Sequence, residues 1–338
     1  MLELVGSMLD FSFPEVHPGA KMSISFERTL RIPDDGKRYH LPPSLGCFPI
    51  LDLDTLPPER VPTKWKEQGG ILLPMYQSEA MWINFHPHYP ERRGGAYPFA
   101  VRIATGKISA ISGKAFVKNM KENDYVVIPE QPWLDGFVVD DNFIRQFIAA
   151  PLGSGLSVEA QISGEDKIGG IQIEVIPMKN NIFNEKFPKL KGGVLKGFNK
   201  TGSYDAEYCA CACASFDSVE PDMSLAAGGK MKQSIEKDPH GLDVWDVEHS
   251  SRAFIRLTNS TLWRAITGTE PPSLPITAKE YSSAGLPWFD YYTDGPTLKA
   301  TEELKSIKSV KEMGGELPEN ESADDSNVKD LSNEVQHQ

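Results

Sequence analysis

The residues best suited to chemistry in this sequence lie in the segment 129–136, which reads Pro-Glu-Gln-Pro-Trp-Leu-Asp-Gly. Glu130, Gln131, Trp133 and Asp135 are close together between two strand-like stretches, and two prolines restrict the backbone. A rigid loop that presents carboxylates beside an indole suits ligand binding, or acid–base chemistry where burial raises a carboxyl pKa. A structural corner, with Trp133 in the core and Asp135 capping a turn, explains the same composition.

Residues of similar character flank this loop on both sides. Tyr76 and Glu79 precede it, near Trp82, and Arg145 follows it. We expect these residues to line the same aromatic and carboxylate-lined cleft as the loop. The predicted ligand-binding residues are Glu130, Gln131, Trp133, Asp135, Tyr76, Glu79 and Arg145.

Three histidines are candidate partners for a catalytic carboxylate. His86 and His88 are one residue apart, so an extended backbone presents both imidazoles on one side, and His240 has several aspartates nearby. No third ligand has the spacing of a metal site, and ordinary loop histidines explain the pattern as well. An enzyme would use Glu130 or Asp135 as its acid–base group, with one of these histidines as its partner.

Three crowded cysteines, Cys209, Cys211 and Cys213, alternate with alanines. On a strand the three thiols would share one face. Zinc sites, however, use wider cysteine spacings and a second ligand pair, which this chain lacks, and cysteine often packs as a small apolar residue. We therefore predict no metal site. Four cysteines in a chain of 338 residues do not form a disulfide framework and favour a reducing, cytoplasmic location.

Composition excludes some classes of protein and divides the chain. The net charge of −12 argues against nucleic-acid binding, which needs basic surface, and no apolar run is long enough to span a membrane. Residues 312–338 hold eight acidic residues and one lysine, so we expect an acidic disordered tail. We expect an N-terminal extension over residues 1–21 and a single β-rich globular domain over residues 22–311.

The apolar pattern predicts an α+β, β-rich fold. Hairpins are expected where residues 104–107 and 140–142 separate alternating stretches, and further strands at 171–175 and 252–257. Helices are expected after Ser157, over 260–267 and after Thr277. The segment 223–235, which contains Gly228 and Gly229, is interpreted as a loop followed by a short helix. We predict an antiparallel sandwich or open barrel with peripheral helices.

Several runs of this sequence resemble a family of uncharacterised hypothetical proteins found in bacteria and fungi. These runs are MYQSEAMWINF, YPFAVRIATGKISAISG, YVVIPEQPWLDGF, IRQFIAAPLG, GGIQIEVIPMK and AGLPWFDYY. The resemblance covers approximately residues 22–292 and implies that this region is one unit. It implies no activity and no catalytic residues.

Two functions from different classes remain open. The first is a soluble binding or interaction protein that uses the cleft at Trp133 to hold a small molecule or a protein. The second is an enzyme of unrecognised type, with Glu130 or Asp135 and a histidine as its acid–base groups. The sequence names no cofactor, and the partners remain unknown.

Overall fold

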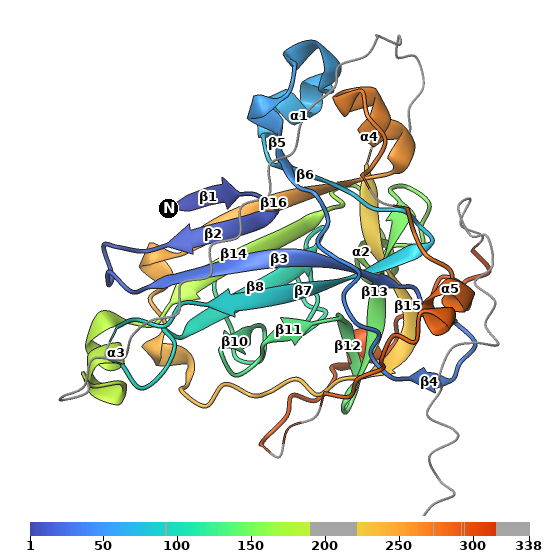
Figure 1. The fold of residues 1–338 in the computed structure, drawn as a ribbon. Coiled ribbons are helices and arrows are strands. Elements are labelled where there is room, and N and C mark those ends of the chain that lie inside the picture. The colour runs from blue at the N-terminus through green and yellow to red at the C-terminus, as the bar shows by residue number, and fades with distance from the viewer. Residues whose placement is uncertain (92, 190–221, 273, 292, 294, 316–338) are drawn as a thin grey trace, which may run out of the picture.

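The structure is a computed structural model that describes residues 1–91, 93–189, 222–272, 274–291, 293 and 295–315 (Figure 1). Cys209, Cys211, Cys213 and most of the acidic tail lie outside the described residues. The described part is β-rich, with a large, mainly antiparallel sheet that is not closed into a barrel, and a few helices. The predicted fold class is confirmed.

Strands occur along the described chain from residue 2 to residue 258. They are β1 (Leu2–Val5), β2 (Met8–Ser12), β3 (Lys21–Leu30), β4 (Arg38–Tyr39), β5 (Leu51–Asp52), β6 (Ile71–Pro74), β7 (Glu79–Pro87), β8 (Phe99–Thr105), β9 (Ile108–Ser109), β10 (Val126–Ile128), β11 (Trp133–Leu134), β12 (Gly136–Asp140), β13 (Phe143–Pro151), β14 (Ile171–Pro177), β15 (Met223–Lys232) and β16 (Ser251–Thr258).

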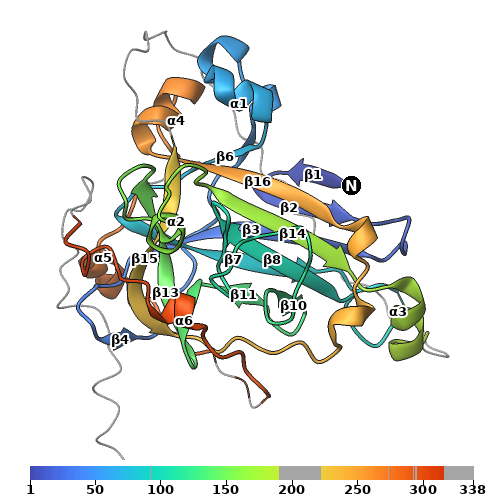
Figure 2. The same cartoon turned by 180° about the vertical axis from the view of Figure 1, so that it is seen from behind.

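The sheet bends back on itself, so that its two halves lie face to face. The main strand order is β1-β2-β3-β7-β13-β15-β16-β14-β8-β10. In Figure 1, β3 and β7 pass in front of β14 and β8, and the view from behind in Figure 2 reverses this order. Apolar side chains fill the space between the halves; Phe13 and Phe99, for example, have ring centroids 5.8 Å apart. The core therefore resembles that of a sandwich whose layers are joined through β13 and β15.

Short helices lie at the periphery. They are α1 (Thr63–Gln68), α2 (Val158–Ser163), α3 (Asn180–Lys186), α4 (Ser260–Thr267), α5 (Ala278–Ser283) and α6 (Glu302–Lys305), with 3-10 turns η1 (Leu53–Thr55), η2 (Pro58–Arg60), η3 (Leu242–Val244) and η4 (Val247–His249). Helices α1 and α4 pack together at one end of the sheet (Figure 1).

The predicted turns and helix caps agree with the structure. The hairpins β8–β9 and β12–β13 form where expected. Ser157 and Asn259 accept the N-terminal backbone hydrogen bonds of α2 and α4, and Thr277 forms the predicted capping box of α5. Each cap satisfies backbone donors that the helix itself leaves unpaired. These local interactions need no tertiary context, which explains why the sequence predicts them.

The segment 223–235 was predicted incorrectly. Residues Met223–Lys232 form β15, a central strand paired along most of its length with β13. Its glycines allow close packing: a Cβ atom on Gly229 would lie 2.3 Å from the carbonyl oxygen of Pro33, and one on Gly228 would lie 3.1 Å from Ile148. The glycine pair therefore reflects a close approach of backbone from another part of the chain.

The first residues also differ from expectation. Residues 1–21 were expected to be an extension, but they contain β1 and β2, and β2 pairs with β3. Leu9 and Phe11 are fully buried in the core, as is Phe13 after the strand. The sheet therefore begins at Leu2. Because this hairpin is short and mixed in composition, its burial depends on β3 and is not evident from local pattern alone.

Candidate functional site

Two of the predicted site residues in the loop 129–136 face the core. Gln131 is completely buried, and its amide donates to the carbonyl oxygen of Trp133 at 2.9 Å while its Oε1 accepts from the Glu236 backbone at 2.9 Å. Asp135 is 2% exposed, and its Oδ2 accepts from the Gln233 amide at 2.7 Å. These bonds fasten the loop to the segment that follows β15. Gln131 and Asp135 therefore hold the loop in position.

Burial has a clear electrostatic consequence for Asp135. Desolvation raises the pKa of its carboxyl to about 7, although the hydrogen bonds from Gln233 and Trp133 act in the opposite direction. A carboxyl group with this pKa has the proton affinity of an acid–base catalyst. It lies inside the protein, however, between the loop and Gln233. The arrangement gives Asp135 a structural role.

The outward side of the loop forms an aromatic cluster with two distant segments. Trp133, on β11, lies opposite Asn84 of β7. Its ring packs edge-on against Trp82 at a centroid distance of 6.1 Å and against Tyr291 at 4.8 Å. All three rings are partly exposed. The indole Nε1–H of Trp82 is buried and has no hydrogen-bond partner among the described residues.

Two glutamates adjoin these rings. The Tyr291 hydroxyl donates to Glu236 Oε1 at 2.9 Å and lies 3.1 Å from the backbone oxygen of Glu130. Burial, and then the contact with Glu236, raises the pKa of Tyr291, which keeps the phenol a neutral donor. We call the set of five residues the aromatic–carboxylate surface: Trp82, Trp133, Tyr291, Glu130 and Glu236.

Glu130 also reaches one of the predicted histidines. Its Oε1 lies 3.5 Å from Nε2 of His240, and both side chains are mostly buried, with 26% and 11% of their surfaces exposed. Glu130 Oε2 and His240 Nε2 have no hydrogen-bond partner among the described residues. The imidazole packs edge-on against Trp245 at 5.9 Å. The structure therefore brings together one of the carboxylate–histidine pairs that the sequence left open.

The other predicted histidines lie in a different place. His86 Nε2 is 2.8 Å from Ser25 Oγ, which in turn donates to Glu27 at 2.6 Å, and burial lowers the pKa of His86. His86 and His88 border a cavity of about 570 Å³ at the start of β3. Ser25 is 1% exposed, so it is not accessible as a nucleophile. The polar chain across β3 and β7 serves to satisfy buried groups.

Of the three flanking candidates, Glu79 and Arg145 are held in ionic contacts, and Tyr76 is held by a backbone hydrogen bond. Glu79 is buried, pairs with Arg28 at 2.9 Å, and accepts from the Tyr76 backbone at 3.0 Å. Arg145 donates to Glu312 at 2.6 Å and lies 3.8 Å from Asp34. These contacts connect the sheet to other segments of the chain. They give the three residues a structural role and assign none of them to the aromatic–carboxylate surface.

Sequence reasoning did not single out Glu236 or Tyr291 as site residues. Tyr291 belongs to a conspicuous aromatic run, 286–292, which was a usable signal, but Glu236 has no distinctive local pattern. Their separation from Trp133 exceeds 100 positions along the chain, as the contact between Gln131 and Glu236 illustrates. Only the folded backbone brings them together.

Metal and membrane signals are weak in the described residues. No group of three or more histidine, cysteine, aspartate or glutamate side chains in the described ranges could hold a metal ion. No helix in that part of the chain is both long and apolar enough to cross a membrane.

Comparison with known proteins found no relative. No family model matches the chain, and neither the curated proteins nor the solved structures contain a match. The resemblance to an uncharacterised bacterial and fungal family therefore stays a prediction.

Proposed function

We propose that the protein is a non-enzymatic binding protein whose aromatic–carboxylate surface holds a cationic group. The observation that carries the proposal is the edge-on contact of Trp133 with both Trp82 and Tyr291, whose hydroxyl donates to the Glu236 carboxylate. Aromatic rings attract ammonium and guanidinium ions through their electron-rich faces, and adjacent carboxylates add charge attraction. The ligand class is an organic ammonium or guanidinium, free or on a protein side chain.

The surroundings of the rings support this chemistry. Gln131 and Asp135 fix the backbone on either side of Trp133, so the indole is held in place before a ligand arrives. Preorganised groups lose less conformational entropy on binding. The rings and the Glu236 carboxylate together favour an organic ammonium or guanidinium compound.

Titration of the protein with choline and with arginine methyl ester tests this proposal, with intrinsic tryptophan fluorescence and calorimetry as readouts. We expect saturable binding, and we expect Trp133→Ala to weaken it about tenfold, as loss of a cation–π partner and its packing predicts. Glu236→Gln should weaken binding and reduce its salt dependence. The neutral isostere 3,3-dimethylbutanol should bind more weakly than choline.

Trp288→Ala is a suitable control because this indole is also partly buried but packs against Tyr281, away from the loop. It should leave cation binding within about twofold of wild type. Equal affinity for choline and its neutral isostere, or equal losses in the two tryptophan variants, would argue against a cation site.

A second candidate is an enzyme that uses Glu130 and His240 as an acid–base pair. The observation that favours it is their 3.5 Å contact, in which each side chain keeps one atom without a hydrogen-bond partner among the described residues. A carboxylate can orient an imidazole and stabilise its protonated form during proton transfer. This geometry matches one of the pairs considered from sequence.

Incubation of the protein with a metabolite extract, followed by mass spectrometry, separates the two candidates. An enzyme should deplete at least one compound over time, and Glu130→Gln and His240→Gln should each abolish that depletion. A binding protein should retain a compound in proportion to protein concentration, without turnover. If the compound is still depleted in both variants, Glu130 and His240 are not the acid–base pair.

A further inference from the structure

A cavity of about 430 Å³ opens on the outer face of the sheet, away from the aromatic–carboxylate surface. Its walls come from α1, the loop after β9, the turn before β14, and strands β14 and β16. This volume lies in the range of small-molecule sites. The lining residues are Lys64, Phe116, Lys167, Ile168, Gln172, Ile173, Arg252, Ala253, Phe254 and Arg256.

The charge of this lining is opposite to that of the whole chain. Lys64, Lys167, Arg252 and Arg256 line the cavity, and none of the lining residues is acidic, although the chain carries a net charge of −12. Like charges repel one another. Carboxylates outside the lining offset part of this repulsion, because Lys167 lies 3.0 Å from Glu165 and both arginines also have acidic partners. A concave, basic surface attracts and concentrates anions.

The arginine side chains are fixed before any ligand binds. Arg256 is 2% exposed; its Nε donates to the carbonyl oxygen of Gly69 at 3.1 Å, and its NH1 lies 3.8 Å from Asp222. Its guanidinium stacks on Phe254, 4.9 Å from the ring centroid. Arg252 is bound through Nε to Glu174 at 2.9 Å. Both carboxylates lie outside the lining; they offset part of the arginine charge, while the charged groups that line the cavity are all basic.

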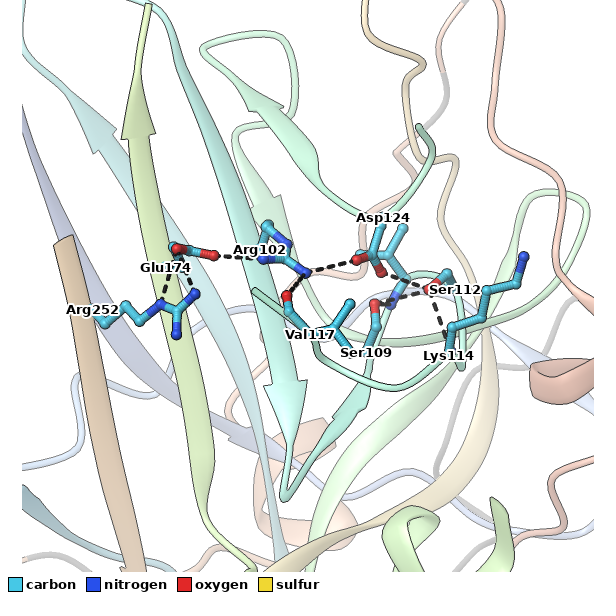
Figure 3. A network of polar contacts seen from close by, with 9 residues as sticks. Arg102, Ser109, Ser112, Lys114, Val117, Asp124, Glu174 and Arg252 are labelled. Atoms are coloured by element: carbon cyan, nitrogen blue, oxygen red, sulfur yellow. Dashed lines mark hydrogen bonds and ion pairs between the residues drawn. The ribbon is translucent and has the colours of Figure 1, made fainter. Parts of the chain in front are cut away.

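A buried polar network supports the same wall (Figure 3). Arg102 is fully buried between Glu174, at 2.6 Å, and Asp124, at 3.1 Å. Its NH2 also donates to the backbone oxygen of Val117 at 2.9 Å, which holds the loop after β9 against the sheet. Phe116 lies over the Arg102 guanidinium at 4.4 Å and so faces the cavity from a fixed position.

We infer that this cavity binds a small organic anion, a carboxylate or a phosphate monoester, whose ring or apolar body lies beside Phe116 and Phe254. Guanidinium and ammonium groups form charge-assisted hydrogen bonds with either kind of anion. The two rings supply apolar contact for the rest of the ligand. The basic side chains of α1 and of the sheet would then contact the anionic group of one ligand.

Calorimetric titration of the full chain with phenyl phosphate and with benzoate tests the inference and separates the two anion chemistries. We expect saturable binding of at least one probe, weaker at high salt because charges are screened. The neutral analogue benzyl alcohol should bind far more weakly. The double variant Lys64→Gln/Lys167→Gln should weaken anion binding about tenfold, since two charged partners are lost.

Both substituted lysines are exposed, so the double variant should fold normally, which circular dichroism would verify. Lys66→Gln is the matched control, because Lys66 is exposed on the same helix and does not line the cavity. Trp133→Ala should leave anion binding intact, which keeps this site distinct from the proposed cation site. Equal binding of benzyl alcohol, equal losses in Lys66→Gln, or no saturation by either anion would overturn the inference.

Discussion

The buried carboxylate of Asp135 accepts a hydrogen bond from the amide of Gln233 at 2.7 Å, although the two residues are 98 positions apart. The Gln233 side chain also accepts from the Asp135 backbone at 3.0 Å. This reciprocal pair joins the loop 129–136 to the end of the central strand β15. It sets where Trp133 lies and therefore where the aromatic–carboxylate surface forms.

The same pair predicts a particular dependence of stability on pH. Burial raises the pKa of Asp135 to about 7, so the folded protein holds a proton that the unfolded chain has released above pH about 4. The free energy of unfolding should therefore fall as pH rises from about 4 to 7, through this group. Denaturant titrations across this range should give a steeper fall for wild type than for Asp135→Asn. Parallel curves would show that Asp135 is not the titrating group.

Gly229 should be intolerant of even the smallest side chain. A Cβ atom there would lie 2.3 Å from the carbonyl oxygen of Pro33, which forces the two segments apart. We expect Gly229→Ala to lower the free energy of unfolding by about 1–3 kcal/mol, the usual cost of overpacking. Gly94→Ala is the control, because no atom lies within 4 Å of its added Cβ. Equal stability of the two variants in urea titrations would contradict the close approach.

Arg102 should be essential for stability because it neutralises two buried carboxylates. Replacement by Met leaves Glu174 and Asp124 without their shared partner, and breaking such a buried pair costs about 3–5 kcal/mol. Adding Asp124→Asn should recover part of that loss, since one uncompensated charge is then removed. Arg264→Gln, at an exposed position, should change the unfolding midpoint little. A loss of stability in Arg102→Met no larger than that in Arg264→Gln would refute the network.

Cys47 should react slowly despite being exposed. The residue is exposed, but its sulfur is partly desolvated; this, together with the Glu27 carboxylate 3.3 Å away, raises the pKa of the thiol to about 11. The thiolate is the reactive form, so alkylation by iodoacetamide at pH 8 should be slower than that of a model thiol by about two orders of magnitude. Peptide mass mapping isolates this cysteine from the others. Glu27→Gln should accelerate the reaction, and an unchanged rate would exclude the carboxylate as a cause.

Local pattern accounts for a large part of the fold. The hairpin between β8 and β9, the capping box at Thr277 and the cap at Asn259 follow from residues adjacent in sequence. The prediction for Met223–Lys232 was wrong for the opposite reason. Its glycines indicate a turn locally, whereas their neighbours are Pro33, in the segment after β3, and Ile148 on β13.

Some residues of the candidate site can likewise be predicted from local sequence, and others cannot. The sequence identified Trp133 and Glu130 as residues of interest, since a carboxylate beside an indole on a proline-restricted loop is a local property. It could not choose among three histidines for Glu130, nor find Glu236. That choice depends on which loops the bent sheet brings side by side.

By itself, then, the sequence determined the β-rich class, the main turns and the loop around Trp133, because backbone preference and alternation of apolar residues act over a few positions. The tertiary structure alone decided that Gln131 and Asp135 face inward while Trp133 meets Trp82 and Tyr291. It likewise gathered four basic side chains around one cavity. Contacts between distant segments depend on strand register and burial, and no local pattern encodes them.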